Sequence, residues 1–337
     1  MAAGTAPAAG GRSVFERSPV ARLPDRLLRW GLTGLAGGIL ALIAFFFIRL
    51  YVEAKPAFDR FGVIGFVFDN NWDVSANQYG AWALVVGTLI TSAIALVIGV
   101  PIAVATALYI AELAPRRLRG VLTVMIELLA AVPSVVYGLW GVFFLIPKLR
   151  GAEVWVGHTL SFVPFIGLPD DQKTIPGPNY FIAGLILAIM ILPLVSAISR
   201  EVIATVPKEN KEAALALGAT RWEMIRMTVL PYSRAGIAGA SMLGLGRAIG
   251  ETIAVTLVIG NAPQIGENIW SQGYTLAAVI ANEFNEAASV PIHRAALIAA
   301  GLVLFVLTLL VNIVARYFVV RAERGGAPKV APGMSGG

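Results

Sequence analysis

The chain has 337 residues, of which 57% are hydrophobic and only 14% are charged, against roughly 25% charged residues in an ordinary soluble domain. Its apolar residues stand in long blocks, which predicts an integral membrane protein. Cysteine is absent, which excludes disulfides, thiolate catalysis and Cys-ligated metals. The net charge of +6 does not indicate nucleic acid binding, because many basic residues lie at the ends of hydrophobic blocks, as in proteins that face anionic lipid headgroups.

Six hydrophobic runs are long enough, at about 1.5 Å per residue, to cross or nearly cross a hydrocarbon core of roughly 30 Å. They cover residues 30–48, 82–110, 121–146, 180–199, 235–259 and 295–315. No A-x-A cleavage site closely follows the first run, so we interpret it as a retained helix rather than a signal peptide. Pro133 is expected to kink or break the third run.

Lys and Arg outnumber Asp and Glu in alternate connections: the N-terminal tail, residues 111–120, residues 200–234 and the C-terminal tail. This bias predicts an all-α membrane protein with six spans and both termini in the cytoplasm. We expect a disordered cytoplasmic tail at 1–28, a transmembrane domain at 29–321 that contains a loop at 207–231, and a second cytoplasmic tail at 322–337. The other connections, which include the acidic pair Asp170 and Asp171, are expected outside.

The two histidines, His158 and His293, lie far apart in the sequence without metal-ligand spacing around either. We expect both to be ordinary loop residues.

The 207–231 loop has the pattern of a helix, a turn and a second helix. Pro207 suits a first helical position, and Glu209 and Glu212 complement the dipole of the first helix. Gly218 can adopt the left-handed conformation that ends a helix.

Thr220 and Glu223 have the spacing of a capping box, which begins the second helix. Trp222, Ile225 and Val229 would give that helix one apolar face, and Pro231 is expected to stop it. From these residues alone, the loop is either a contact for a partner protein or an amphipathic element that lies on the membrane.

The fifth run carries two charged residues, Arg247 and Glu251, in its interior. Burying such a charge costs about 2.5 to 3.5 kcal/mol even on insertion-based scales, so Arg247 should face protein or a water-filled cavity. Glu251 is four residues on and is expected on the same helix face. The two residues either form an ion pair that fixes packing, or Arg247 offers its guanidinium to a passing oxyanion. Glu127, in the third run, is a second buried carboxylate that could pair with an Arg, line a path or be protonated.

The order Glu212, Ala213, Ala214, Gly218 and then Leu230-Pro231 resembles the EAA loop of ABC-importer permeases. In that family the loop docks into a groove on the ATPase subunit. Thr228 stands where the family usually has isoleucine, a departure that concerns packing. No lysine in this chain follows a glycine, so the chain has no Walker A motif, and a separate polypeptide would bind the nucleotide.

The segments ELLAAVPSVVYGLWG (127–141) and GRAIGETIAVTLVIGNAP (246–263) extend the resemblance to permeases of bacterial phosphate-specific ABC importers, over residues 80–320. The resemblance implies the type I importer fold and a role in transport for the residues at Arg247 and Glu251. It also implies partners: a second, PstA-like permease subunit, two PstB-like ATPases that hold ATP and Mg, and a PstS-like phosphate-binding protein outside. No cofactor is expected in this chain.

Two alternatives remain at this point. The chain could be a permease for another oxyanion, such as molybdate or sulfate, because an arginine alone does not distinguish these anions. It could instead be a membrane-embedded enzyme that acts on lipid phosphates. That reading needs a nucleophile with a base at the same depth, and Ser241 has no evident base partner.

Overall fold

The structure of the chain is a computed structural model that describes residues 23–168 and 174–325. Helix α1 begins at Leu23 and helix α13 ends at Gly325, so both predicted tail boundaries fall inside helices, and the predicted domain bounds stay predictions. Residues 1–22 and 326–337 lie outside the described residues, as do Asp170 and Asp171.

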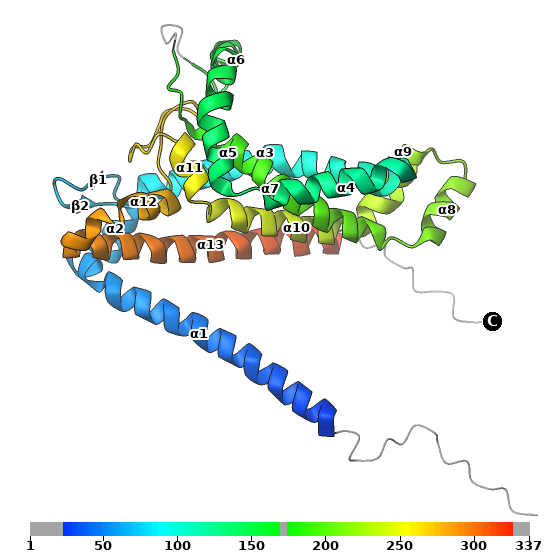
Figure 1. The fold of residues 1–337 in the computed structure, drawn as a ribbon, viewed down its shortest axis with the longest axis horizontal. Coiled ribbons are helices and arrows are strands. Elements are labelled where there is room, and N and C mark those ends of the chain that lie inside the picture. The colour runs from blue at the N-terminus through cyan, green and yellow to red at the C-terminus, as the bar shows by residue number, and fades with distance from the viewer. Residues whose placement is uncertain (1–22, 169–173, 326–337) are drawn as a thin grey trace, which may run out of the picture. The chain divides into compact units, whose positions relative to one another are not determined.

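Helices account for most of the described chain, which confirms the predicted fold class (Figure 1). The α-helices are α1 (Leu23–Phe61), α2 (Val63–Phe68), α3 (Trp82–Leu108), α4 (Arg116–Ala131), α5 (Ser134–Trp140), α6 (Ile146–Thr159), α7 (Tyr180–Ala204), α8 (Lys208–Ala216), α9 (Arg221–Met224), α10 (Leu230–Ile249), α11 (Ile253–Val258), α12 (Leu276–Glu283) and α13 (Pro291–Gly325). Three π-helical turns join or extend them: η2 (Tyr109–Leu113), η3 (Gly141–Leu145) and η4 (Ile225–Val229). A 3-10 turn, η5 (Glu286–Ser289), and a hairpin of β1 (Trp72–Asp73) and β2 (Gln78–Tyr79) complete the list.

The chain divides into two units, residues 1–52 and 53–337. The described part of the first unit belongs to α1, which contains the run predicted at 30–48. Side chains from Leu27 to Ile48 are all exposed, as expected of a helix whose apolar surface meets lipid or another chain.

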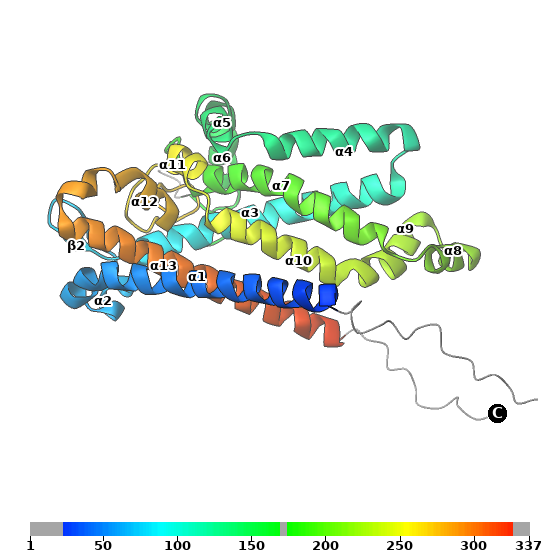
Figure 2. The same cartoon turned by 60° about the horizontal axis from the view of Figure 1, so that its bottom comes forward.

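Helices α3, α7, α10 and α13 form the body of the second unit and run alongside one another (Figure 2). Small residues let them approach closely. A Cβ at Gly184 on α7 would lie 2.5 Å from Ile94 on α3, and a Cβ at Gly244 on α10 would lie 2.7 Å from Val195 on α7. Close approach through glycines is typical of helix packing in membranes, where van der Waals contact replaces the hydrophobic drive.

Two of the predicted spans are broken. The third run breaks at Val132 and Pro133, between α4 and α5, as predicted. The prediction of one continuous helix at 235–259 is wrong, because α10 ends at Ile249 and α11 begins only at Ile253.

Five helical segments of the described chain are long and apolar enough to cross a membrane: 27–61, 82–113, 134–159, 180–204 and 291–317. The region 235–259 is not among them, so the count of six spans and the orientation of the termini stay predictions.

The two ends of the second unit differ (Figure 1). Helices α8 and α9 of the 207–231 loop lie at one end. The hairpin and α12 lie at the other end. The segments predicted as external loops are partly helical. Helix α6 occupies part of 147–179, and α12 occupies part of the connection before the last span.

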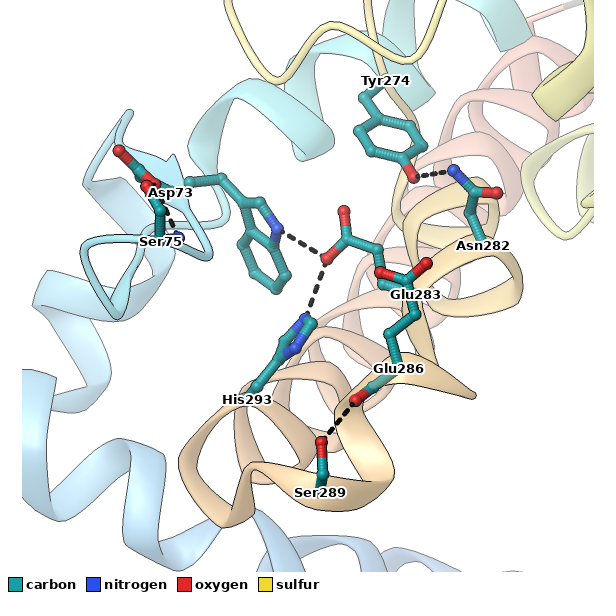
Figure 3. Close-up of polar contacts among 9 residues, drawn as sticks. Asp73, Ser75, Tyr274, Asn282, Glu283, Glu286, Ser289 and His293 are labelled. Carbon is teal, nitrogen blue, oxygen red and sulfur yellow. Dashed lines mark hydrogen bonds and ion pairs between the residues drawn. The ribbon is translucent and has the colours of Figure 1, made fainter.

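A polar cluster ties the hairpin to α12 and α13 (Figure 3). The carboxylate of Glu283 lies 2.9 Å from His293 Nε2 and accepts a hydrogen bond from Trp72 Nε1 at 3.1 Å. The ring of Tyr79 stacks on His293 with centroids 5.3 Å apart. The expectation of loop histidines is wrong, because His293 is buried on α13 and His158 lies in the last turn of α6.

Candidate coupling loop and substrate path

The first helix of the 207–231 loop ends as predicted. Gly218 has φ +87°, and nothing within 4 Å would meet a Cβ there, so its backbone conformation is what requires glycine. The N–H of Ala219 donates to Ala214 O at 3.2 Å, and the N–H of Gly218 donates to Leu215 O at 3.0 Å. These two bonds form a Schellman motif, which satisfies the last carbonyls of α8.

The second helix of the loop begins with the predicted capping box. Glu223 N–H donates to Thr220 Oγ1 at 3.3 Å, and the Thr220 N–H donates back to Glu223 Oε2 at 2.8 Å. Bonds from the backbone and the hydroxyl of Thr220 hold the pKa of Glu223 below its usual value. The turn between the two helices is thus specified on both sides by local hydrogen bonds.

Pro231 does not stop the second helix, contrary to the prediction. Helix α9 continues through the π-turn η4 into α10, and Pro231 lies in the first turn of α10. The π-turn directly before Pro231 changes the local hydrogen-bonding register, and such adjustments let a helical segment continue through a proline. Ile225 and Val229 are buried as expected of an apolar face, whereas Trp222 is exposed.

The loop forms a concavity with a volume of about 810 Å³ between α8 and the start of α10. Ala213, Ala214, Gly218 and Met227 line it, and Leu217 beside them is 90% exposed. Glu212 lines a separate, smaller concavity of about 250 Å³. The residues predicted for ATPase contact therefore divide between two neighbouring surfaces, both of which are open in this chain.

An ion pair that the sequence reasoning missed ties this loop to α3. Lys211 Nζ on α8 lies 2.5 Å from Glu112 Oε1 in η2, the π-turn that extends α3. The two side chains are only 17% and 11% exposed. The residues are 99 positions apart, and no spacing pattern in the sequence connects them.

Arg247 and Glu251 are not placed as predicted. Arg247 lies in the last turn of α10, and its side chain is exposed on this chain. Glu251 follows the end of α10, and its Oε1 accepts a long 3.4 Å hydrogen bond from Ala254 N–H at the start of α11. The expectation that both residues share one helix face is wrong, because the helix ends between them.

The two helix breaks lie near each other, because α5 packs against α11. A Cβ at Gly138 on α5 would lie 2.7 Å from Leu257 on α11. Tyr137 on α5 donates its hydroxyl to Leu129 O at 2.8 Å across the first break. Non-helical backbone at membrane depth is tolerated where it is buried in protein or lines a water-filled cavity, and transporter binding sites use such discontinuous helices.

Glu127 pairs with an arginine, one of the three roles left open for it. Its Oε1 lies 3.8 Å from Arg200 of α7, which also donates to Thr123 Oγ1. Glu127 is 61% exposed and Arg200 26% exposed, so this is a loose surface pair. Arg200 was missed because it lies one residue past the predicted fourth span. Glu127 is not ion-paired with Arg247 in the described structure.

Comparison with known proteins defines the class to which this architecture belongs. Residues 99–324 match the family model described as "Binding-protein-dependent transport system inner membrane component". A crystal structure of a bacterial ABC transporter involved in the import of the acidic polysaccharide alginate shares the fold, with a TM-score of 0.52 and 21% identity over 89% of this chain and 99% of that one. The chain therefore belongs to the family of binding-protein-dependent transport system inner membrane components. It is a multi-pass transport component of the bacterial inner membrane rather than an enzyme.

Several curated relatives are similar to this chain over most of its length. The phosphate transport system permease protein PstC of Mesorhizobium japonicum is 42% identical over 86% of this chain and 88% of the relative. PstC of Haemophilus influenzae is 40% identical over 85% and 90%, and PstC 2 of Mycobacterium tuberculosis is 42% identical over 88% and 92%. The likeness covers nearly the full length of each of these proteins.

Proposed function

We propose that this chain is the permease subunit of an ATP-driven importer that carries inorganic phosphate across the bacterial cytoplasmic membrane. The observation that carries the proposal is its identity of 40% to 42% with PstC permeases over at least 85% of the chain. Its specific partners would be a PstA-like permease subunit, two PstB-like ATPases with ATP and Mg, and a PstS-like binding protein.

The open concavities of the 207–231 loop support a docking role. Ala213, Ala214 and Gly218 line the larger one with small residues, so a partner could approach the backbone of α8 closely. Insertion of a helical element into a groove of another protein is a recurrent mode of recognition. In our proposal, closure of the ATPase dimer moves this loop, and hydrolysis of ATP returns it.

The two helix breaks support a substrate path near Arg247. A phosphate that crosses the membrane loses its hydration, and a fixed guanidinium offsets part of that cost. Because Arg247 is exposed on this chain, the second permease subunit would lie opposite it and enclose the path. Glu251, at the break between α10 and α11, would limit how tightly the anion is held, since transport requires release.

Radiolabelled phosphate uptake tests the proposal. Cells with and without this gene are compared at low external phosphate, in competition with sulfate and molybdate. We expect the gene to be required for an ATP-dependent uptake of labelled phosphate. Unlabelled phosphate should compete with this uptake strongly, and sulfate and molybdate should not. If sulfate or molybdate uptake is lost instead, the chain is still an importer permease, but the assignment of phosphate as its substrate is wrong. Phosphatase activity of the purified chain without an ATPase would support the alternative of an enzyme that acts on lipid phosphates.

A further inference from the structure

We propose that the ion pair of Lys211 and Glu112 is a positioning element of the 207–231 loop, which fixes α8 to the π-helical end of α3 so that movement of the loop reaches α3. This inference rests on the proposed function, because it concerns how an ATPase outside this chain drives transport. Lys211 and Glu112 are positioning residues: neither is placed in the substrate path.

Glu112 stands where its own helix disfavours a carboxylate. It lies in the last turn at the C-terminal end of α3 and η2, where the partial charge of the backbone is negative. The local helix therefore does not explain Glu112, whereas its 2.5 Å contact with Lys211 of α8 does.

The pair is also well placed to control α8, which has no buried residue of its own. Ala214 is partly buried and packs against an apolar cluster that includes Ala107 of α3 and Ile203 of α7. Two low-exposure charges beside this cluster are screened less by water than a surface pair, so their attraction holds α8 in one orientation.

The backbone already joins the loop to α7 before it and to α10 after it. Helix α3 has no such covalent link, and it meets the loop through the apolar cluster at Ala107 and through the Lys211 and Glu112 contact. At its far end α3 reaches the opposite side of the bundle, where Thr88 Oγ1 accepts a hydrogen bond from Leu276 N–H of α12 at 3.1 Å. Helix α3 thus connects the loop with the segment before the last helix, and the ion pair makes it follow the loop (Figure 2).

The test uses the complete transporter in proteoliposomes, with its binding protein, and measures anion transported per ATP hydrolysed. Lys211→Met and Glu112→Gln each remove one charge with little change in volume. We expect each to lower this ratio at least about fivefold, the lower end of typical coupling between sites. The charge-reversed double variant, Lys211→Glu with Glu112→Lys, should recover at least half of the original ratio. Arg119→Met, which removes an exposed cation of α4 seven residues after Glu112 in the chain, is the matched control and should leave the ratio unchanged.

A normal ratio in both single variants would overturn the proposal, as would a double variant no better than the single ones. A second measurement covers the case in which the single variants fail to assemble. Because the chain has no cysteine, two introduced cysteines would be its only thiols. Lys211→Cys with Glu112→Cys, joined by a short thiol-specific cross-linker that a reductant cleaves, should keep its coupling until reduction. Coupling unaffected by reduction would also overturn the proposal.

The ratio is first measured for the unaltered transporter with phosphate, sulfate and molybdate. If another anion is the one transported, the proposed function fails in its substrate, and the ion pair is tested with that anion.

Discussion

Arg247 and Glu251 stand four residues apart in the sequence but are separated by a break in the helix, because α10 ends at Ile249. Arg247 therefore occupies the C-terminal turn of α10, where the helix dipole favours a cation. Glu251 instead accepts a hydrogen bond from the first turn of α11. Among the described residues no ion pair involves Arg247, and in our proposal its guanidinium meets the transported oxyanion.

Replacing Arg247 by Gln should lower phosphate uptake roughly 10- to 100-fold, since a hydrogen bond to a charged group contributes about 1.5 to 3 kcal/mol. Assembly with the partner subunits should be unchanged, because no ion pair between described residues depends on this side chain. Uptake and co-purification of the complex are measured together. Arg316→Gln, at an exposed arginine of α13, serves as control. If Arg247→Gln prevents assembly, Arg247 has a structural role instead.

Replacing Gly218 by Val should uncouple ATP hydrolysis from transport. A left-handed conformation costs a residue with a Cβ about 1 to 2 kcal/mol, and φ at this position is +87°. The Schellman motif of α8 would be lost and the loop displaced. Gly218→Asn is the matched control, because asparagine tolerates this conformation. A Val variant that transports as much phosphate per ATP as the Asn variant would argue against the loop as the relay.

Two glycines of α10 should respond differently to alanine. At Gly244 a new Cβ would lie 2.7 Å from Val195, so Gly244→Ala should destabilise the protein by about 1 to 3 kcal/mol through overpacking. At Gly239 nothing lies within 4 Å, so alanine should be neutral or stabilise the helix by up to about 1 kcal/mol. Thermal unfolding of the purified protein in detergent measures both. Equal effects would contradict the packing of α10 against α7.

Alkaline pH should destabilise the segment around Tyr274. Burial raises the pKa of Tyr274 to about 12, and Asn282 Nδ2 donates to its hydroxyl oxygen at 3.0 Å (Figure 3). Because the folded pKa lies above the ordinary value of 10.0, the contribution of Tyr274 to stability is complete below pH 10 and is lost as the pH rises through about 12. The apparent melting temperature is followed over this range. Tyr274→Phe should show a smaller fall than the unaltered protein, and an equal fall would assign the effect to other groups.

The 207–231 loop illustrates what could be predicted from the sequence. Its turn at Gly218 and its capping box at Thr220 and Glu223 depend on residues within five positions of one another, so spacing alone specifies them. The break at Pro133 is local in the same sense, because proline disrupts the helix that contains it. The apolar runs likewise determined that the chain belongs in a membrane.

The features that were not predicted from the sequence have two different causes. Hydropathy alone made residues 235–259 one span, because a break at glycine leaves the apolar pattern intact. The pairs of Lys211 with Glu112 and of Arg200 with Glu127 join residues far apart in the chain. The spacing of such residues carries no signal, since the packing of α3, α4, α7 and α8 alone brings them together. The sequence by itself therefore determined the membrane class and the local form of the loop, and only the tertiary structure decided which charges meet.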